Sequence, residues 1–382
     1  MSTIFSTLFL VLASPILAAP NSYPTNESYP HPANGICIDY TVKEEVTWTK
    51  SIWGIPKPKN NFDIAALRIS EGALDYDFEP ISGYENATST YQLAGTFCSP
   101  SKKVGNKEKT VLLATHGGGY DRRYWASSYM PSKYNFVQYA LENGYSVFYY
   151  DRLGTGQSQI VSGYESQGAN QVELIAKIAS SIRSGRYSGS IEASKVVLVG
   201  HSLGSVFSAG AIIKYPSIAE GQFAAGATSL TLKAGLSATF QNALLASTVN
   251  PPFKRDSGYV VIGDIYAHAR SFFSQPFDIP TLEYAQSIVQ PASIVEMLSS
   301  ANVKFDESSY NGSVLLTAGE YDILACGGNC YPRFEYGVQN KTFPVAKPLE
   351  TYIHPGAGHG VNFANNATGF YATVIDFVNR NI

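Results

Sequence analysis

The chain has 382 residues, 27 basic and 30 acidic side chains and a formal net charge of -3. This weakly acidic balance offers no basic surface for a phosphate backbone, so we expect no nucleic-acid partner. Charged residues make up only 15% of the chain, whereas 26 residues are Tyr and 20 are Phe, a composition that excludes a disordered protein and supports a large core. The length fits two domains of about 150 residues each, or one larger α/β domain with insertions.

The N-terminus has the pattern of a secretory signal peptide. The run Ile4–Leu17 is mostly apolar, and the first charged side chain is Glu27. The run is shorter than the roughly 20 residues that a spanning helix needs, and Ala18, Ala19 and Pro20 follow it. We therefore predict a signal peptide over residues 1–19 and a secreted, extracellular protein, with a retained N-terminal anchor as the alternative. No later window predicts a membrane span.

Glycosylation sequons agree with export. Each is an Asn-x-Ser/Thr triplet without Pro in the middle, which predicts an exposed loop or turn in a glycoprotein. The sequons begin at Asn26, Asn86, Asn311, Asn340 and Asn366.

The four cysteines are an even set, and in an oxidising compartment they predict disulfides. Three connectivities are open, of which we favour Cys37 with Cys98 and Cys326 with Cys330. The first pair would join two strand-like segments, 36–46 and 91–97, and the second would close a Gly-rich loop. No His lies at ligand spacing from either pair, which disfavours a zinc site, and no metal is expected.

The chain from about Thr110 alternates short apolar runs with helical patterns, the signal of βαβ units on a mostly parallel sheet with helices on both faces. Residues 170–182 and 368–380 have helical spacing. The alternation breaks over about 232–308, an aromatic-rich stretch that we predict to be a helical cap or lid insertion in one domain spanning 20–382. The expected strands are Val111–Ala114, Tyr145–Tyr150, Val196–Val199, Phe223–Leu230, Val314–Thr317 and Leu349–Ile353.

A Gly-x-Ser-x-Gly pentapeptide marks the candidate nucleophile, Ser202. It follows an apolar strand and opens a helix, with Gly200 and Gly204 flanking the serine. The pentapeptide alone occurs by chance, but the strand–turn–helix context is the one that a nucleophile elbow requires, because small residues allow the sharp bend.

A serine nucleophile needs a base and an acid that orients this base. After the strand 314–317 comes Asp322, and after the strand 349–353 comes His359 in a Gly-rich loop. We predict Asp322 as the acid, with Glu320 as the alternative, and His359 as the base. His354, at the strand end, is expected to be structural, and His201 is expected to face away from Ser202 or to pack beneath the elbow.

Acyl transfer also needs donors for the oxyanion. One would be the backbone N–H of Leu203, directly after the nucleophile. The other is expected from the loop that ends His116-Gly-Gly-Gly119, with Gly118 as first choice and Gly119 as second, because glycines let a backbone approach closely. A phosphate-binding loop would need a Lys and a later acidic partner that this stretch lacks.

These motifs together resemble the α/β-hydrolase superfamily, in particular its secreted fungal members. The resemblance runs from about Thr110 to Ile382 without the insertion, and it includes Asp151-Arg-Leu-Gly-Thr-Gly-Gln-Ser158, which in that family is mainly structural. It implies an α/β-hydrolase fold, with antiparallel strands before Thr110. A Ser at the elbow argues against the epoxide hydrolase and dehalogenase branches, where the nucleophile is Asp.

The prediction is therefore a secreted serine hydrolase that cleaves a small-molecule carboxylic ester through an acyl-enzyme, without metal or organic cofactor. The aromatic, charge-poor insertion favours an apolar or aromatic acyl or alcohol part. The alternatives are a serine peptidase on the same triad, a secondary-metabolite lactonase or acyltransferase, and a catalytically inactive binding protein. The sequence leaves the substrate and the oligomeric state open.

Overall fold

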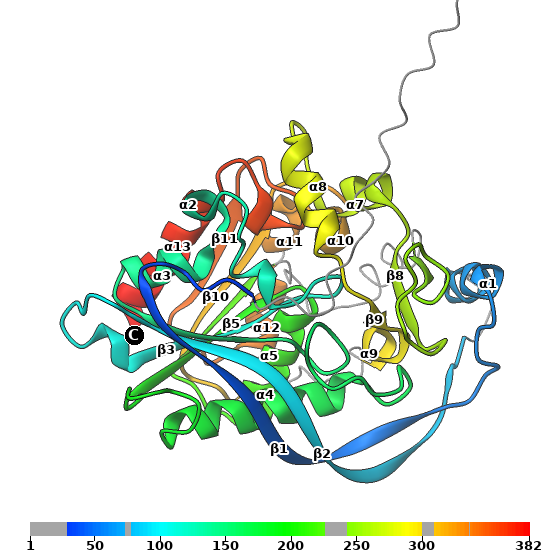
Figure 1. Ribbon diagram of the computed structural model, residues 1–382, viewed down its shortest axis with the longest axis horizontal. Helices are drawn as coiled ribbons and strands as arrows, with labels where there is room; N and C mark the ends of the chain where they lie inside the picture. Colours follow the sequence, from blue (N-terminus) through cyan, green and yellow to red (C-terminus); the bar gives the residue numbers. More distant parts are fainter. Residues whose placement is uncertain (1–28, 73–77, 226–242, 300–308, 336) are drawn as a thin grey trace, which may run out of the picture.

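The computed structural model describes residues 29–72, 78–225, 243–299, 309–335 and 337–382, and its centre is an eight-stranded sheet (Figure 1). Neighbouring strands pair in parallel along the series β4, β3, β5, β6, β10 and β11, whereas β1 pairs with β2 and β2 with β4 antiparallel. The mostly parallel sheet predicted from the alternating pattern is thereby confirmed, and so are the antiparallel strands before Thr110. In spatial order the strands are β1 (Gly35–Trp53), β2 (Ile81–Pro100), β4 (Ser146–Tyr150), β3 (Thr110–Thr115), β5 (Lys195–His201), β6 (Gly221–Ala225), β10 (Ser313–Gly319) and β11 (Leu349–His354).

Helices cover both faces of the sheet because successive side chains of a strand point to opposite faces. Val111 and Leu113 of β3 belong to the apolar cluster under α4 (Gly168–Arg183) and α5 (Leu203–Lys214). Leu112 and Ala114 belong to the cluster under α3 and α13. A strand buried on both faces has no polar alternation, which is why β3 appears in the sequence as a continuous apolar run. The remaining helices of this domain are α2 (Pro131–Tyr134), α3 (Phe136–Glu142), α10 (Ile323–Cys326), α11 (Tyr331–Glu335), α12 (Val338–Thr342) and α13 (Ala367–Asn381).

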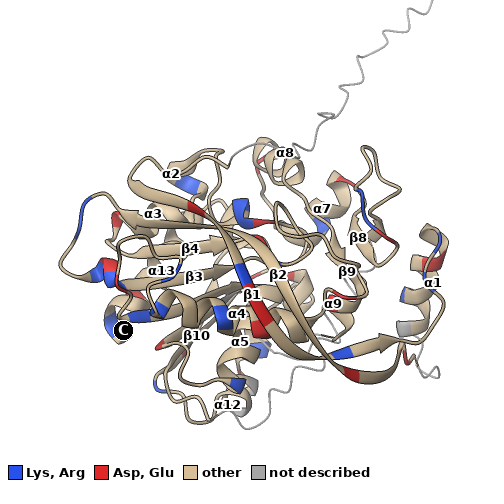
Figure 2. Ribbon diagram, turned by 60° about the horizontal axis from the view of Figure 1, so that its bottom comes forward, with Lys and Arg blue, Asp and Glu red and all other residues tan. Residues whose placement is uncertain are grey.

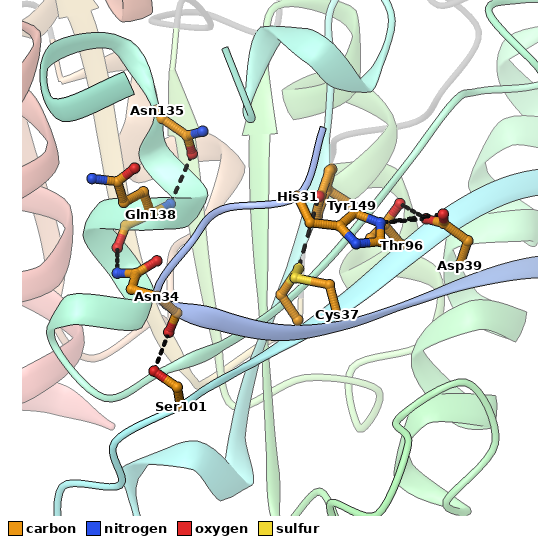
Figure 3. The surroundings of a disulfide bond; sticks show 10 residues. His31, Asn34, Cys37, Asp39, Thr96, Ser101, Asn135, Gln138 and Tyr149 are labelled. Atoms are coloured by element: carbon orange, nitrogen blue, oxygen red, sulfur yellow. Dashed lines mark hydrogen bonds and ion pairs between the residues drawn. A yellow bond between two sulfur atoms is a disulfide. The ribbon is translucent and has the colours of Figure 1, made fainter. Parts of the chain in front are cut away.

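Strands β1 and β2 form a long ribbon that extends beyond the sheet towards α1 (Asn61–Gly72) (Figure 1). Both strands are longer than predicted. In β1 the alternation of buried and exposed side chains continues to Trp48, beyond the predicted end at residue 46. Cys37 and Cys98 lie opposite each other in this ribbon and form a disulfide (Figure 3). Cys326 and Cys330 form the second disulfide, so the favoured pairing is the one that the structure shows.

The described part of the insertion between β6 and β10 contacts the loops that follow β3 and β11, for example through Ile262 and Phe272. It contains short helices, as predicted, but also a three-stranded antiparallel sheet that was not predicted. The β-branched pair Val260–Val261 lies in the central strand of this sheet, too short a run to separate from helical core by pattern alone. The outer limits of the predicted insertion lie outside the described residues. Its described elements are β7 (Ala243–Leu245), β8 (Tyr259–Ile262), α7 (Ile265–Phe272), α8 (Ile279–Ser287), β9 (Ala292–Ser293) and α9 (Ile294–Ser299).

Basic and acidic residues are interspersed along the β1–β2 ribbon and the helices (Figure 2). Within the described residues, no helix is long and apolar enough to cross a bilayer.

The predicted signal peptide, residues 1–19, and the sequon at Asn26 lie outside the described residues. The other four sequon asparagines are all exposed. Two of them do not lie in loops or turns, since Asn86 is in β2 and Asn340 is in α12. The expectation of loops was wrong for these two, because a solvent-facing position on a ribbon or a short helix exposes a side chain equally well.

Candidate active site

Ser202 occupies a sharp turn between β5 and α5. Its backbone has φ 51° and ψ -122°, a positive φ that a residue with a Cβ adopts only under strain. The two glycines around it have no room for a side chain. A Cβ on Gly204 would lie 2.2 Å from the carbonyl oxygen of Thr115, and one on Gly200 would lie 2.5 Å from the Cα of Ser205. The turn therefore has the strained backbone and close glycine packing that a nucleophile elbow requires, and its partly exposed serine precedes the first turn of α5.

Asp322 and His359 form a buried pair at the ends of β10 and β11. The Nδ1 of His359 lies 2.9 and 2.8 Å from the two carboxylate oxygens of Asp322. Asp322 is fully buried and His359 is 2% exposed. Because a carboxylate can only accept hydrogen bonds, Nδ1 carries the ring proton and donates a hydrogen bond to Asp322. The other ring nitrogen, Nε2, is buried and has no hydrogen-bond partner among the described residues, so it is available to a proton donor.

The backbone around Asp322 keeps its carboxylate in place. Its Oδ1 accepts a hydrogen bond from the N–H of Ala325 at 2.8 Å, as the N-cap of α10. Its carbonyl oxygen accepts from the N–H groups of Cys326 and Gly328, both at 3.1 Å, inside the loop that the Cys326–Cys330 disulfide closes. The alternative acid, Glu320, instead accepts from the N–H of Gly356 and does not contact His359 in these hydrogen bonds.

His201 lies beneath the elbow, as predicted. Its Nε2 donates to the carbonyl oxygen of His359 at 2.9 Å, and its ring stacks on Tyr124 with the centroids 4.3 Å apart. Burial lowers the pKa of His201 well below its ordinary value, and the nearby His359 adds to this effect. His354 is also structural, since its Nε2 donates to the carbonyl oxygen of Asn366.

The glycine loop after β3 lies directly against the elbow. A Cβ built on Gly117 would be 2.7 Å from the Cβ of Ser202, and one built on Gly118 would be 3.2 Å from Cδ1 of Leu203. Gly119 has φ 82°, which a side chain would strain. The predicted donors Leu203, Gly118 and Gly119 thus come from two adjoining backbone segments, one of them a helix N-terminus that favours negative charge.

Side chains of the insertion line the other side of this glycine loop. Cδ1 of Ile262 and Cζ of Phe272 lie 3.3 and 3.7 Å from a Cβ built on Gly119. The Phe272 ring also contacts the His359 ring at 5.1 Å between centroids, and its carbonyl oxygen accepts from the N–H of Gly360 at 2.8 Å. The sequence predicts an aromatic-rich insertion, but no local pattern identifies Phe272 as a neighbour of the site.

A buried hydrogen-bond chain joins the insertion to the residue that follows the glycines. The hydroxyl of Tyr120 lies 2.5 Å from Nε2 of His268, whose Nδ1 lies 2.9 Å from Oε1 of Gln286. Since that amide oxygen accepts from Nδ1, Nε2 is the acceptor for the tyrosine hydroxyl. Burial lowers the pKa of His268 to about 4, so this chain is neutral at pH 7.

Asp151 and Ser158 of the 151–158 motif have structural contacts, as the resemblance implies. Asp151 is fully buried and accepts from the backbone N–H and the guanidinium of Arg122 at 2.9 and 2.8 Å. Ser158 donates from Oγ to the carbonyl oxygen of Asp151. Within the described residues, no group of three or more His, Cys, Asp or Glu side chains could hold a metal ion.

The chain is similar to known proteins in sequence pattern and in fold. The family model described as the alpha/beta hydrolase family matches residues 111–372. No curated protein matches the chain.

Among solved structures, a thermophilic esterase from Thermogutta terrifontis superimposes with a TM-score of 0.52 at 14% identity, covering 76% of this chain and 94% of that one. A monoacylglycerol lipase from Paleococcus ferrophilus gives a TM-score of 0.48 at 18% identity, covering 75% and 98%. The alpha/beta hydrolase GrgF from Penicillium sp. sh18 gives 0.47 at 15%, covering 76% and 94%. At these identities the likeness concerns the fold alone.

Proposed function

The chain belongs to the α/β hydrolase family, and from this premise we propose that it is a serine hydrolase that cleaves a carboxylic ester. One observation carries the proposal. Ser202 sits on a strained elbow, while His359 is bound to Asp322 through Nδ1 and keeps a buried Nε2 without a partner among the described residues. The described hydrogen bonds include none between Ser202 Oγ and this Nε2, but a histidine held in this way is the base that a weakly nucleophilic serine hydroxyl needs.

In the proposed mechanism, Ser202 Oγ attacks the ester carbonyl and its proton passes to Nε2 of His359. Asp322 stabilises the imidazolium that forms, because its buried carboxylate already accepts from Nδ1. The N–H groups of Leu203 and Gly118 stabilise the oxyanion, with Gly119 as the alternative to Gly118. His359 then protonates the leaving alcohol, and a water molecule repeats the sequence on the acyl-enzyme.

The surroundings of the glycine loop support the proposed substrate class. Apolar side chains approach both candidate donors of this loop, with Ala292 Cβ 3.8 Å from a Cβ built on Gly118 and Ile262 and Phe272 near Gly119. These side chains favour an apolar or aromatic acyl or alcohol part over a charged one.

Export is part of the same proposal. It is supported by the apolar segment in residues 1–19, the exposed positions of Asn86, Asn311, Asn340 and Asn366, and the two disulfides. Expression of the full chain in a eukaryotic secretory host tests it. We expect protein in the medium that starts near Pro20 and loses mass on treatment with an N-glycosidase, whereas a cell-retained, unglycosylated chain would contradict export.

Labelling with a fluorophosphonate probe tests the mechanism. The wild-type protein is expected to form a covalent adduct at Ser202, and the Ser202→Ala variant is expected to form none. Ser208→Ala is the matched control, because Ser208 is a buried serine further along α5 and is expected to leave labelling unchanged. A folded wild-type protein without any adduct would overturn the triad and favour an inactive binding protein.

A substrate panel separates the remaining activities of such a triad. We expect p-nitrophenyl esters with apolar acyl groups to be hydrolysed faster than aminoacyl and peptidyl anilides. Preference for the anilides would indicate a peptidase. Product analysis with an added alcohol acceptor identifies an acyltransferase, and ring closure of a hydroxy ester identifies lactonisation.

A further inference from the structure

A second buried group of residues controls how the glycine loop faces the elbow. The carbonyl oxygen of Gly117 accepts two hydrogen bonds, from Nδ1 of His116 at 2.8 Å and from Nη2 of Arg152 at 3.3 Å. In a planar trans peptide the carbonyl oxygen and the following N–H point in opposite directions. The two donors to the Gly117 oxygen therefore fix the direction of the Gly118 N–H, which belongs to the same peptide group.

Arg152 acts on this peptide in two ways. Its backbone N–H donates to Nε2 of His116 at 3.0 Å, so the proton of His116 must be on Nδ1, where it is donated to the Gly117 oxygen. Burial lowers the pKa of His116 well below its ordinary value, with Arg152 adding to the effect, so the ring keeps this neutral form. The guanidinium of Arg152 supplies the second donor directly. Two donors on one carbonyl also polarise the peptide and strengthen its N–H as a donor.

Glu296 of the insertion holds the guanidinium in place. It forms an ion pair with Nη1 of Arg152, and the side chains are 1% and 0% exposed. Arg152 also lies over the ring of Phe207 in α5, 5.5 Å from its centroid. Moving both charges of an ion pair from water into the protein interior costs free energy, so a fully buried pair is weak evidence for a stabilising role. Its contacts are better explained by another role.

We propose that Arg152 and Glu296 are positioning residues that orient the Gly118 N–H towards the oxyanion. Because Glu296 belongs to α9, the reactivity of Ser202 then depends on the position of α9. The inference rests on the proposed function only in naming Gly118 as the oxyanion donor. Neither residue touches the substrate. Arg152 acts through the Gly117–Gly118 peptide, and Glu296 acts through Arg152.

The test uses two variants of the full chain. The double variant Arg152→Met/Glu296→Leu removes both charges of the pair, so no buried charge is left without a partner and the variant is expected to fold. Glu296→Gln keeps the size of the side chain and one acceptor oxygen, and it tests the pair if the double variant does not fold. Ser299→Ala is the control. Ser299 is a buried residue of the same helix that accepts from the N–H of Gly168 and does not contact Arg152 in the described hydrogen bonds.

The first measurement is hydrogen–deuterium exchange of the segment 116–120, which needs no substrate. We expect at least tenfold faster exchange in the double variant, a smaller increase in Glu296→Gln, and none in Ser299→Ala. Unchanged exchange in both charge variants would overturn the proposal. This outcome is independent of whether the wild-type protein reacts with a fluorophosphonate, so failure of the serine-hydrolase mechanism and failure of the positioning role are distinguishable.

The second measurement is ester hydrolysis. Removal of one oxyanion donor costs about 10²- to 10³-fold in kcat, and we expect a misaimed donor to cost about 10- to 100-fold, with KM changed less than about threefold. The affinity for a trifluoromethyl ketone, which forms the tetrahedral adduct, should fall in the same proportion as kcat/KM. A folded variant with kcat within twofold of wild type, or one that loses only KM, would contradict the positioning role.

Discussion

The elbow at Ser202 and the pair formed by Asp322 and His359 are held in different ways. The elbow is fixed by its own backbone and by the glycines around it, which leave no space for a side chain. Asp322 and His359 lie in two loops at the ends of β10 and β11. Neighbouring backbone groups hold Asp322, whereas His359 is held by contacts from distant segments. These include the Phe272 carbonyl, which accepts from Gly360, and the ring of His201, which donates to the His359 carbonyl. Backbone geometry thus places Ser202, whereas tertiary contacts place His359.

The largest effect is expected from the acid. Asp322→Asn keeps the size of the side chain, but its amide can present N–H to Nδ1 and so favour the wrong tautomer of His359. We expect kcat for ester hydrolysis to fall about 10⁴-fold, with the free energy of unfolding much less affected. The matched control is Glu320→Gln, which changes the neighbouring carboxylate that accepts from Gly356. If Glu320→Gln lost activity and Asp322→Asn did not, the assignment of the acid would be reversed.

The two disulfides are expected to separate stability from activity. Cys37–Cys98 spans 61 residues and Cys326–Cys330 spans 4. Loop-closure entropy predicts that removing the first by double Cys→Ser substitution lowers the free energy of unfolding by about 4 kcal/mol, and removing the second by about 2 kcal/mol.

The effect on activity should follow the opposite order. The short bridge closes the loop whose N–H groups bind the Asp322 carbonyl, so we expect kcat to fall about tenfold, whereas loss of Cys37–Cys98 in the ribbon should leave kcat unchanged. Urea unfolding and initial rates, measured on both double variants, test the comparison. Equal loss of kcat in both would show that the short bridge has no specific effect on the acid.

The elbow should be intolerant of even one methyl group. In Gly204→Ala the new Cβ would lie 2.2 Å from the Thr115 carbonyl oxygen and 2.6 Å from that of His116, both of which are backbone. We expect a loss of about 3 kcal/mol in the free energy of unfolding from overpacking, measured by urea titration. Gly83→Ala is the control, because a Cβ there meets only Ile52 Cδ1 at 3.8 Å. Equal stability of the two variants would show that the elbow can relax.

The smallest expected effect is the pH dependence of stability that comes from His201, which links the turn at Ser202 to the His359 loop. Burial depresses the pKa of this residue in the folded state, so below about pH 6.5 the unfolded chain binds a proton that the folded chain does not. Stability is therefore lost as the pH falls, at about 1.4 kcal/mol per pH unit for this one group.

His201→Gln removes the titration and can still donate to the His359 carbonyl. We expect the stability of the wild type, measured by urea unfolding between pH 7 and 5, to fall more steeply than that of the variant. Parallel pH dependences would contradict the buried, neutral state of His201.

Much of this site was predictable because its residues follow directly from strand ends. Each of Ser202, Asp322 and His359 comes a few residues after a short apolar run, and parallel strands end at the same edge of a sheet. Arg152 and Glu296 were not predictable. They are 144 residues apart, and neither has a local pattern that marks a buried ion pair. The small sheet of the insertion was not predicted because its strands of two to four residues are too short to show a periodic pattern.

The sequence by itself determined the sharp turn at Ser202, the chain order of Ser202, Asp322 and His359 after their strands, and the βα alternation. These depend on local backbone preference and on periodicity, which are properties of neighbouring residues. The tertiary structure decided how the glycine loop is aimed, which carboxylate meets His359 and which aromatic rings face the site. Those outcomes depend on hydrogen bonds and packing between segments that only folding brings together.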